Sequence, residues 1–143
     1  MNSQQLQLVN FEQAKRLKQL GFDWGTKDYY NNPIPSCTKK GLNYNKMLYL
    51  PHYRFGGMEY NNGDSISAPT VPLALKWFRD VKMIGCSVTQ VILIGKKSKE
   101  YTFSYNKTYG CDYCTHDFDT YESAESALLD ELLTLIEKEN ENI

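Results

Sequence analysis

Apolar residues recur at helical spacing in three segments of the chain. The segments 11–20, 71–84 and 121–138 each carry an apolar stripe with charged residues beside it, the pattern of an amphipathic helix. The stripes consist of Phe11, Ala14, Leu17 and Leu20, then Ala74, Trp77, Phe78 and Val81, and finally Ala124, Ala127, Leu128, Leu132, Leu135 and Ile136. We therefore predict three helices, each burying one face.

Residues that favour helix ends stand at the borders of these segments. Asn10 and Gln13 have the spacing of a capping box at the start of the first helix. Gly21 follows that helix, in a position that favours the left-handed conformation. Thr70 and Thr120 precede the other two helices, where a side-chain oxygen can accept a hydrogen bond from an unpaired N–H group.

Alternating and β-branched runs predict strands between the helices. Residues 87–94 and 100–106 form the clearest hairpin, and 47–54 and 58–60 form another around a Gly-Gly turn. A further strand is expected within 113–118. The order α-ββ-α-ββ(β)-α predicts an α+β fold, in which an antiparallel sheet of hairpins packs against helices that mostly cover one face.

The segment 23–46 has no regular pattern, because asparagines, prolines and glycine interrupt it. It holds either a short strand near 24–30 or a functional loop. The chain has 143 residues, a length that predicts one domain, 1–143. The ends, 1–9 and 139–143, are expected to fray.

Composition excludes some functions and leaves others open. The net charge of −1 argues against binding to duplex nucleic acid, which needs a broad basic surface. The chain shows no signal-peptide pattern and no apolar run long enough to span a bilayer. We therefore expect a cytoplasmic protein with reduced thiols, no membrane association and no cofactor except a candidate zinc ion.

The candidate zinc site is the run Cys111, Cys114 and His116. Two thiolates separated by two residues can share a tetrahedral zinc ion, and Cys37 or His52 could complete the set. The same pair could instead be a redox dithiol, or part of a thiol enzyme. Ordinary thiols near a turn are the favoured interpretation, because a second Cys pair and a supporting helix are both missing.

The second hairpin suggests a single-stranded nucleic-acid surface as another alternative. Tyr101, Phe103 and Tyr105 alternate along one strand face, and lysines surround them at Lys96, Lys97, Lys99 and Lys107. Aromatic side chains can stack bases while lysines hold the backbone. Strict alternation also fits a buried sheet face, and this second interpretation is favoured.

Tyrosine and asparagine are concentrated in the first half of the chain, and both suit adaptable recognition surfaces. The candidate binding residues are Trp24, Tyr29, Tyr30 and Tyr44. The leading hypothesis is a non-catalytic binding protein that contacts a protein partner through this half, with no catalytic residues.

Three motifs in order resemble a family of small proteins from Bacteroidetes and their phages and mobile elements. They begin with Phe11-Glu12-Gln13-Ala14-Lys15 before Gly21-Phe22, then Ser67-Ala68-Pro69-Thr70 before Leu73-Ala74 and Lys76 to Val81, and end with Thr120-Tyr121-Glu122-Ser123-Ala124 before Leu135-Ile136. The family has no established activity. The resemblance therefore implies an accessory protein acting inside the cell and assigns no catalytic residue.

Overall fold

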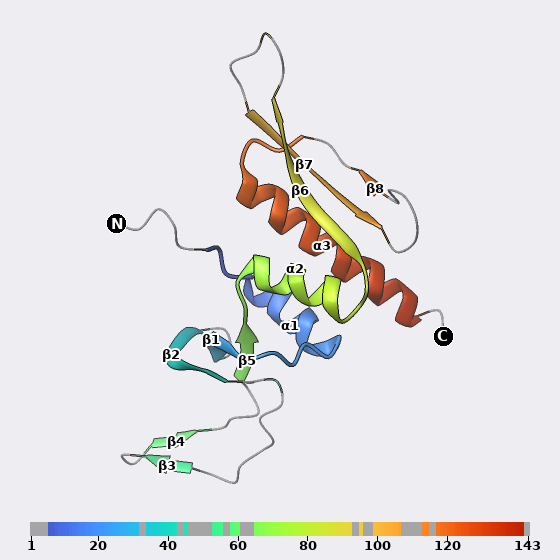
Figure 1. Ribbon diagram of the computed structural model, residues 1–143. Helices are drawn as coiled ribbons and strands as arrows, with labels where there is room; N and C mark the ends of the chain where they lie inside the picture. Colours follow the sequence, from blue (N-terminus) through green and yellow to red (C-terminus); the bar gives the residue numbers. More distant parts are fainter. Residues whose placement is uncertain are drawn as a thin grey trace. The chain divides into compact units, whose positions relative to one another are not determined.

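The protein is described by a computed structural model that covers residues 6–31, 34–42, 45, 53–55, 58–60, 65–92, 95, 99–106, 113–114 and 117–141. Over these residues the elements are, in order, α1 (Phe11–Gln19), β1 (Thr26–Asn31), β2 (Ile34–Leu42), β3 (Tyr53–Phe55), β4 (Met58–Tyr60), β5 (Ser65–Ala68), α2 (Val71–Asp80), β6 (Gly85–Ile92), β7 (Lys99–Asn106), β8 (Tyr113–Cys114) and α3 (Tyr121–Glu141). All strand pairs are antiparallel, in the sheets β2-β1-β5, β3-β4 and β6-β7-β8 (Figure 1). The fold is therefore α+β, as predicted.

The chain divides into two compact units. One, the N-terminal unit, spans Leu8–Pro69; the other, the C-terminal unit, comprises Thr70–Ile143 together with Met1–Gln7. Compact units of this kind occur within single domains as well as between domains. The expected single domain therefore stays a prediction.

Helix α1 has the predicted caps. The Asn10 side chain accepts from the Gln13 N–H at 2.8 Å, and the Gln13 side chain accepts from the Asn10 N–H at 3.0 Å. At the other end Gly21 has φ of 95°, and the Phe22 N–H donates to the Leu17 carbonyl at 3.0 Å. These bonds satisfy backbone groups that the helix leaves unpaired at both ends.

The segment 23–46 contains two strands that the pattern did not define. β1 pairs with β2 and with β5, and its register against β2 shifts between Thr26 and Asp28. Neither strand alternates cleanly between apolar and polar residues, so pairing rather than hydrophobicity identifies them. Asn45 contributes a further tie, since its side chain donates to the Phe22 carbonyl at 2.7 Å and accepts from the Ser67 N–H at 3.0 Å.

Two residues before α1 are held by backbone hydrogen bonds. The Val9 side chain is fully buried, and its N–H donates to the Pro69 carbonyl at 3.0 Å. The Gln7 carbonyl accepts from the Val71 N–H at 2.8 Å. Backbone pairing thus holds residues 7 and 9, while α3 remains helical to Glu141.

In the C-terminal unit, α3 contacts both β6 and β7, and α2 contacts β6 and α3. Thr70 and Thr120 cap α2 and α3 as predicted, accepting from the Leu73 and Ser123 N–H groups at 3.3 and 3.1 Å. Most predicted stripe residues of the two helices are buried. Val81 is the exception in α2, because the helix ends at Asp80 and leaves Val81 48% exposed.

Hairpin β6–β7 is the longest continuous pairing. It runs from Gly85 opposite Asn106 to Ile92 opposite Lys99 without a bulge. Pairing of β3 with β4 likewise confirms the hairpin around the Gly-Gly turn. Among the helices described, none combines the length and apolar character needed to cross a membrane.

Candidate functional site

All four predicted binding residues fall within the N-terminal unit, and one of them, Tyr44, lies outside the described residues. Trp24, Tyr29 and Tyr30 are half-buried. The Tyr30 hydroxyl donates to the Val9 carbonyl at 2.7 Å, and its ring meets Phe11 edge to face at 5.5 Å. Burial, followed by the nearby Asp28 charge, raises the Tyr30 pKa. Tyr30 therefore has internal packing and hydrogen-bonding roles.

Trp24 also has an internal neighbour, because its ring lies 6.2 Å from that of the buried Phe22. Tyr29 stands opposite Ser36 on one side of β1 and Ser67 on the other. Trp24 and the two tyrosines are thus integrated into the unit around α1 and the β2-β1-β5 sheet. Their use as a recognition surface stays a prediction.

The candidate zinc ligands fall largely outside the described residues. Cys111 and His116 lie there, as does His52, while Cys114 stands opposite Ser104 in the β7–β8 pairing. Within the part of the chain that the structure describes, no three His, Cys, Asp or Glu residues gather as a metal site would require. The zinc, redox and thiol-enzyme interpretations of the turn at 111–116 stay predictions.

The aromatic face of β7 packs as a sheet core does. Phe103 is 2% exposed and stacks on Phe118, with ring centroids 5.8 Å apart. Tyr101 meets Tyr121 of α3 edge to face at 5.9 Å. This arrangement matches the core interpretation of the alternating aromatics and leaves the buried Phe103 ring inaccessible to a stacked base. The lysines at 96, 97 and 107 lie outside the described residues.

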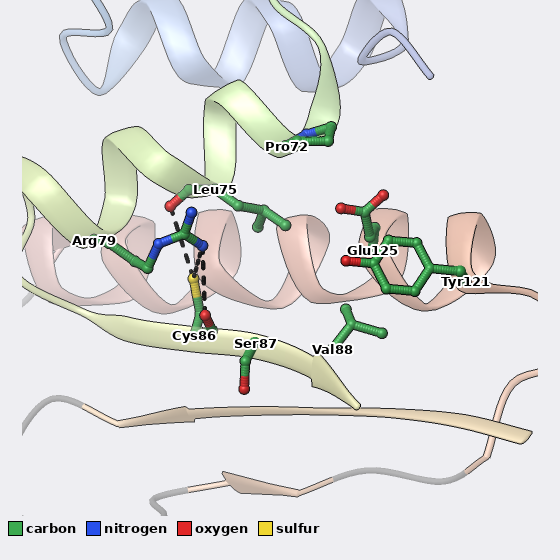
Figure 2. A pocket seen from close by; sticks show the side chains of 8 residues that line it. All are labelled: Pro72, Leu75, Arg79, Cys86, Ser87, Val88, Tyr121 and Glu125. Carbon is green, nitrogen blue, oxygen red and sulfur yellow. Dashed lines mark hydrogen bonds between the residues drawn. The ribbon is translucent and has the colours of Figure 1, made fainter. Parts of the chain in front are cut away.

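A pocket of about 340 Å³ lies in the C-terminal unit between α2, the start of β6 and the first turns of α3. Its walls combine three apolar side chains with a cation, a thiol, two hydroxyl groups and a carboxyl group. The lining residues are Pro72, Leu75, Arg79, Cys86, Ser87, Val88, Tyr121 and Glu125 (Figure 2).

Arg79 and Cys86 form one end of the pocket. The Arg79 guanidinium donates to the Cys86 carbonyl at 3.4 Å and lies 3.7 Å from the Cys86 sulfur. The thiol in turn donates to the Leu75 carbonyl at 3.7 Å. Burial raises the pKa of the Cys86 thiol. The hydrogen bond and the charge of Arg79 lower it to a smaller extent, so the pKa stays above its usual value. Cys86 is therefore a protonated packing residue near neutral pH, not an activated nucleophile.

Tyr121 and Glu125, one turn apart on α3, form the other end. Figure 2 shows the Tyr121 hydroxyl directed into the pocket, and the Glu125 side chain extending from α3 toward Pro72. Glu125 is only 5% exposed, and burial, followed by the Glu122 charge, raises its pKa. Burial, with the Glu125 charge second, also raises the Tyr121 pKa.

The sequence contained a pattern that could have found Glu125. The residue occupies the buried face of α3 one turn before Leu129 and two turns before Leu132, so it replaces an apolar residue on an extended stripe. Arg79 and Cys86 gave no such pattern, because seven positions and a change from helix to strand separate them. Only the fold brings them together.

Comparison with protein-family models, with curated proteins and with solved structures yields no match to this chain. The chemistry of the site must therefore guide the assignment of function. The raised pKa of Cys86 disfavours its thiolate, and apolar side chains share the pocket walls with the polar groups. Such an arrangement suits the binding of an extended, amphipathic group.

Proposed function

We propose that this protein is a non-catalytic accessory protein that binds a protein partner, and that the partner adds an extended segment to the edge of β6. The observation that carries the proposal is the character of this edge. β6 contains no charged residue, no proline and no bulge over eight residues, and among the described strands it pairs with β7 alone.

An edge strand of this kind is uncommon in natural proteins unless another chain pairs with it. Unpaired N–H and C=O groups along an edge strand are a template for another chain, so natural proteins protect most edges with charges, prolines or bulges. Strand addition is a frequent mode of peptide recognition, in which main-chain hydrogen bonds supply affinity and pockets select side chains. β6 has an edge that no other described strand pairs with, and an adjoining pocket in which Arg79 donates to the Cys86 carbonyl of the strand.

Exposed apolar residues adjoin the same strand in sequence or line its pocket. Of the five large hydrophobic side chains that are exposed among the described residues, three precede or belong to β6 and one lines the pocket. They are Val81 and Met83 before the strand, Ile92 at its end and Tyr121 at the pocket. Met83 and Ile92 are each 74% exposed. We call β6 together with these four residues the β6 edge site.

The loop before β6 contains a residue in a strained backbone conformation. Met83 has φ of 59°, and it is the one non-glycine residue with positive φ among those described. A bulky side chain in this conformation costs roughly 1–2 kcal/mol relative to the right-handed form. Strained backbone concentrates at binding and switching sites, and here the strain holds an exposed methionine at the start of the edge strand.

The three ordered motifs resemble the family from Bacteroidetes and their phages. This resemblance supports an accessory protein that is encoded in such a genome and acts inside the cell. The β6 edge site moves the proposed contact from the tyrosine-rich first half to the C-terminal unit. The half-buried packing of Trp24 and Tyr30 supports this choice.

Selection from a library of randomised short peptides, followed by hydrogen exchange, tests the proposal. Bound peptides should slow exchange at alternate amides of β6, because only every second residue of a strand faces a given neighbour. Gln90→Lys should weaken binding about tenfold by placing a charge on the edge. Gln19→Lys, the same substitution at an exposed glutamine of α1, should leave binding unchanged.

Three results would overturn the proposal: selection of no binding peptide, protection confined to β1 and β5, or equal binding by both lysine variants. A second copy of the chain could also pair along β6, and light scattering would reveal it as a concentration-dependent doubling of mass. If the mass doubles, Gln90→Lys abolishes this doubling and no peptide binds, then β6 pairs with a second copy of the chain and not with a partner protein.

A further inference from the structure

The pocket beside β6 contains a buried carboxyl group for which the structure supplies no counterion. Glu125 is 5% exposed and makes no hydrogen bond or ion pair with any residue that the structure describes. The carboxylate oxygens are not among the fully buried side-chain atoms that lack a hydrogen-bond partner, and Glu125 lines the pocket. A carboxylate that lines a pocket without a bonded cation can bind a positively charged group there.

The charged groups facing Glu125 favour the same conclusion. From α3 it meets the Glu122 charge, which adds to the effect of burial on its pKa, and the Tyr121 hydroxyl. From β6 the nearest titratable group in the pocket is the protonated Cys86 thiol. The one cation that lines the pocket, Arg79 of α2, donates to the Cys86 carbonyl. Its charge also reaches Tyr121, where it partly opposes the rise in the pKa.

The remaining walls suit an alkyl chain. Pro72, Leu75 and Val88 line the pocket between its two polar ends. A volume of about 340 Å³ lies near the lower limit of the roughly 300–1,000 Å³ range of ligand sites, so it favours one long side chain over a large cofactor. Lysine and arginine combine an apolar stem with a cationic head, and routinely bury the stem along apolar surface.

We infer that this pocket binds the side chain of a lysine or arginine carried by the partner segment that pairs with β6. The stem lies along Leu75 and Val88, and the head reaches the Glu125 carboxylate and the Tyr121 hydroxyl. Arg79 repels a second cation from the opposite end and so fixes the direction of the side chain. The inference rests on the proposed strand addition for its source of lysine, but the pocket's chemistry can be tested alone.

The probe for the pocket alone is Nα-acetyl-lysine methylamide, titrated into the full chain and followed by NMR shifts of backbone amides. We expect shifts at Val88, Tyr121 and Glu125. The norleucine analogue, which keeps the stem and lacks the charge, should bind about tenfold more weakly or not at all, because a hydrogen-bonded ion pair is lost. The arginine analogue should bind at the same amides.

Glu125→Gln should reduce lysine-probe binding about tenfold, whereas Glu122→Gln, at an exposed position on the same helix, should change it far less. In the wild-type protein, affinity should fall as the pH drops through the pKa of Glu125, since protonation removes the counterion. Equal binding of the norleucine probe, unchanged binding by Glu125→Gln, or no binding at all would overturn the inference.

The two proposals fail separately. If selected peptides protect β6 but tolerate replacement of every lysine and arginine by norleucine, strand addition stands and the cationic pocket is wrong. If the lysine probe binds at Glu125 but no peptide protects β6, the pocket stands and strand addition is wrong. If Nα-acetyl-glutamate methylamide binds at Arg79 and the lysine probe does not bind, then the pocket takes an acidic side chain and the inference is wrong.

Discussion

The two units present sheet edges of opposite character. β2, at one edge of the N-terminal sheet, has the sequence IPSCTKKGL and contains a proline and two lysines, Pro35, Lys39 and Lys40. β6, at one edge of the C-terminal sheet, has the sequence GCSVTQVI and contains neither. Proline and lysine are devices that discourage pairing with another chain. Under the proposed strand addition, β2 is the protected edge and β6 the available one, while the other N-terminal edge, β5, is only four residues long.

The residues with positive φ angles also differ. Gly21 at the end of α1 and Gly95 after β6 adopt such angles without steric cost. The loop before β6 instead uses Met83, which does not. Gly21 avoids backbone strain and so favours the stability of the fold. Met83 keeps a large exposed side chain in spite of the strain.

The largest expected effects test whether the two units are separable. Leu17 in α1 and Leu128 in α3 are both fully buried, and replacing either by alanine should cost about 2–5 kcal/mol. Urea unfolding measures the loss. Hydrogen exchange should quicken mainly in β1 and β5 for Leu17→Ala, and in β6 and β7 for Leu128→Ala. Equal quickening of both sheets by both variants would show one cooperative domain.

Proline substitutions in β6 should separate its two sides. Backbone N–H groups along a strand face opposite neighbours at successive residues, so Thr89 and Gln90 present theirs to different sides. One of Thr89→Pro and Gln90→Pro should lose a β7 hydrogen bond and cost about 3 kcal/mol, by analogy with proline in other regular structure. The other should cost far less but abolish peptide pairing. Equal destabilisation by both would contradict a free edge.

Substitutions at Gly21 and Met83 should have opposite signs. Gly21→Ala should destabilise by about 1 kcal/mol, because the alanine Cβ disfavours the left-handed conformation. Met83→Gly should stabilise by up to about 1 kcal/mol while weakening peptide binding. Met83→Ala serves as the control, since it removes the long side chain and keeps the strain. Thermal unfolding gives the signs, and a loss on Met83→Gly would refute the argument from strain.

The smallest expected effect concerns Glu125. Burial raises its pKa, so the folded protein binds this proton more tightly than the unfolded chain does. The contribution of Glu125 to stability is therefore greatest below the ordinary glutamate pKa and declines as the pH rises through the raised value. Glu125→Gln should stabilise by less than about 1 kcal/mol near neutral pH, and the gain should vanish in acid. A pH-independent difference would exclude ionisation as the cause.

The candidate site shows where sequence reasoning reaches its limit. Its cysteine, Cys86, lies between the predicted helix at 71–84 and the predicted strand at 87–94, and belongs to β6 in the structure. The sequence favoured Cys111 and Cys114 instead, because they are close in sequence. The position of Glu125 on the apolar stripe of α3 marks it as a buried carboxyl group, but it does not show which elements enclose it. Spacing along the chain identifies ligands that share a turn, but not groups that meet across α2, β6 and α3.

Local interactions made much of the fold predictable. The caps of α1, α2 and α3 and the hairpin β6–β7 depend on residues near in sequence, so Asn10, Thr70 and Thr120 could be read directly. β1 was one of two alternatives for the segment 23–46, and β2 was not predicted, because their polar sequences become strands only through pairing.

What the sequence by itself determined is therefore the α+β class, the helices and their caps, since short-range hydrogen bonds and hydrophobic periodicity encode them. What only the tertiary structure decided is which strand edge stays unpaired and which polar group is buried. Both depend on contacts between elements far apart in the chain. β6 is an edge because no other described strand pairs with its second side, and Glu125 lies in a pocket because α2 and β6 enclose that turn of α3.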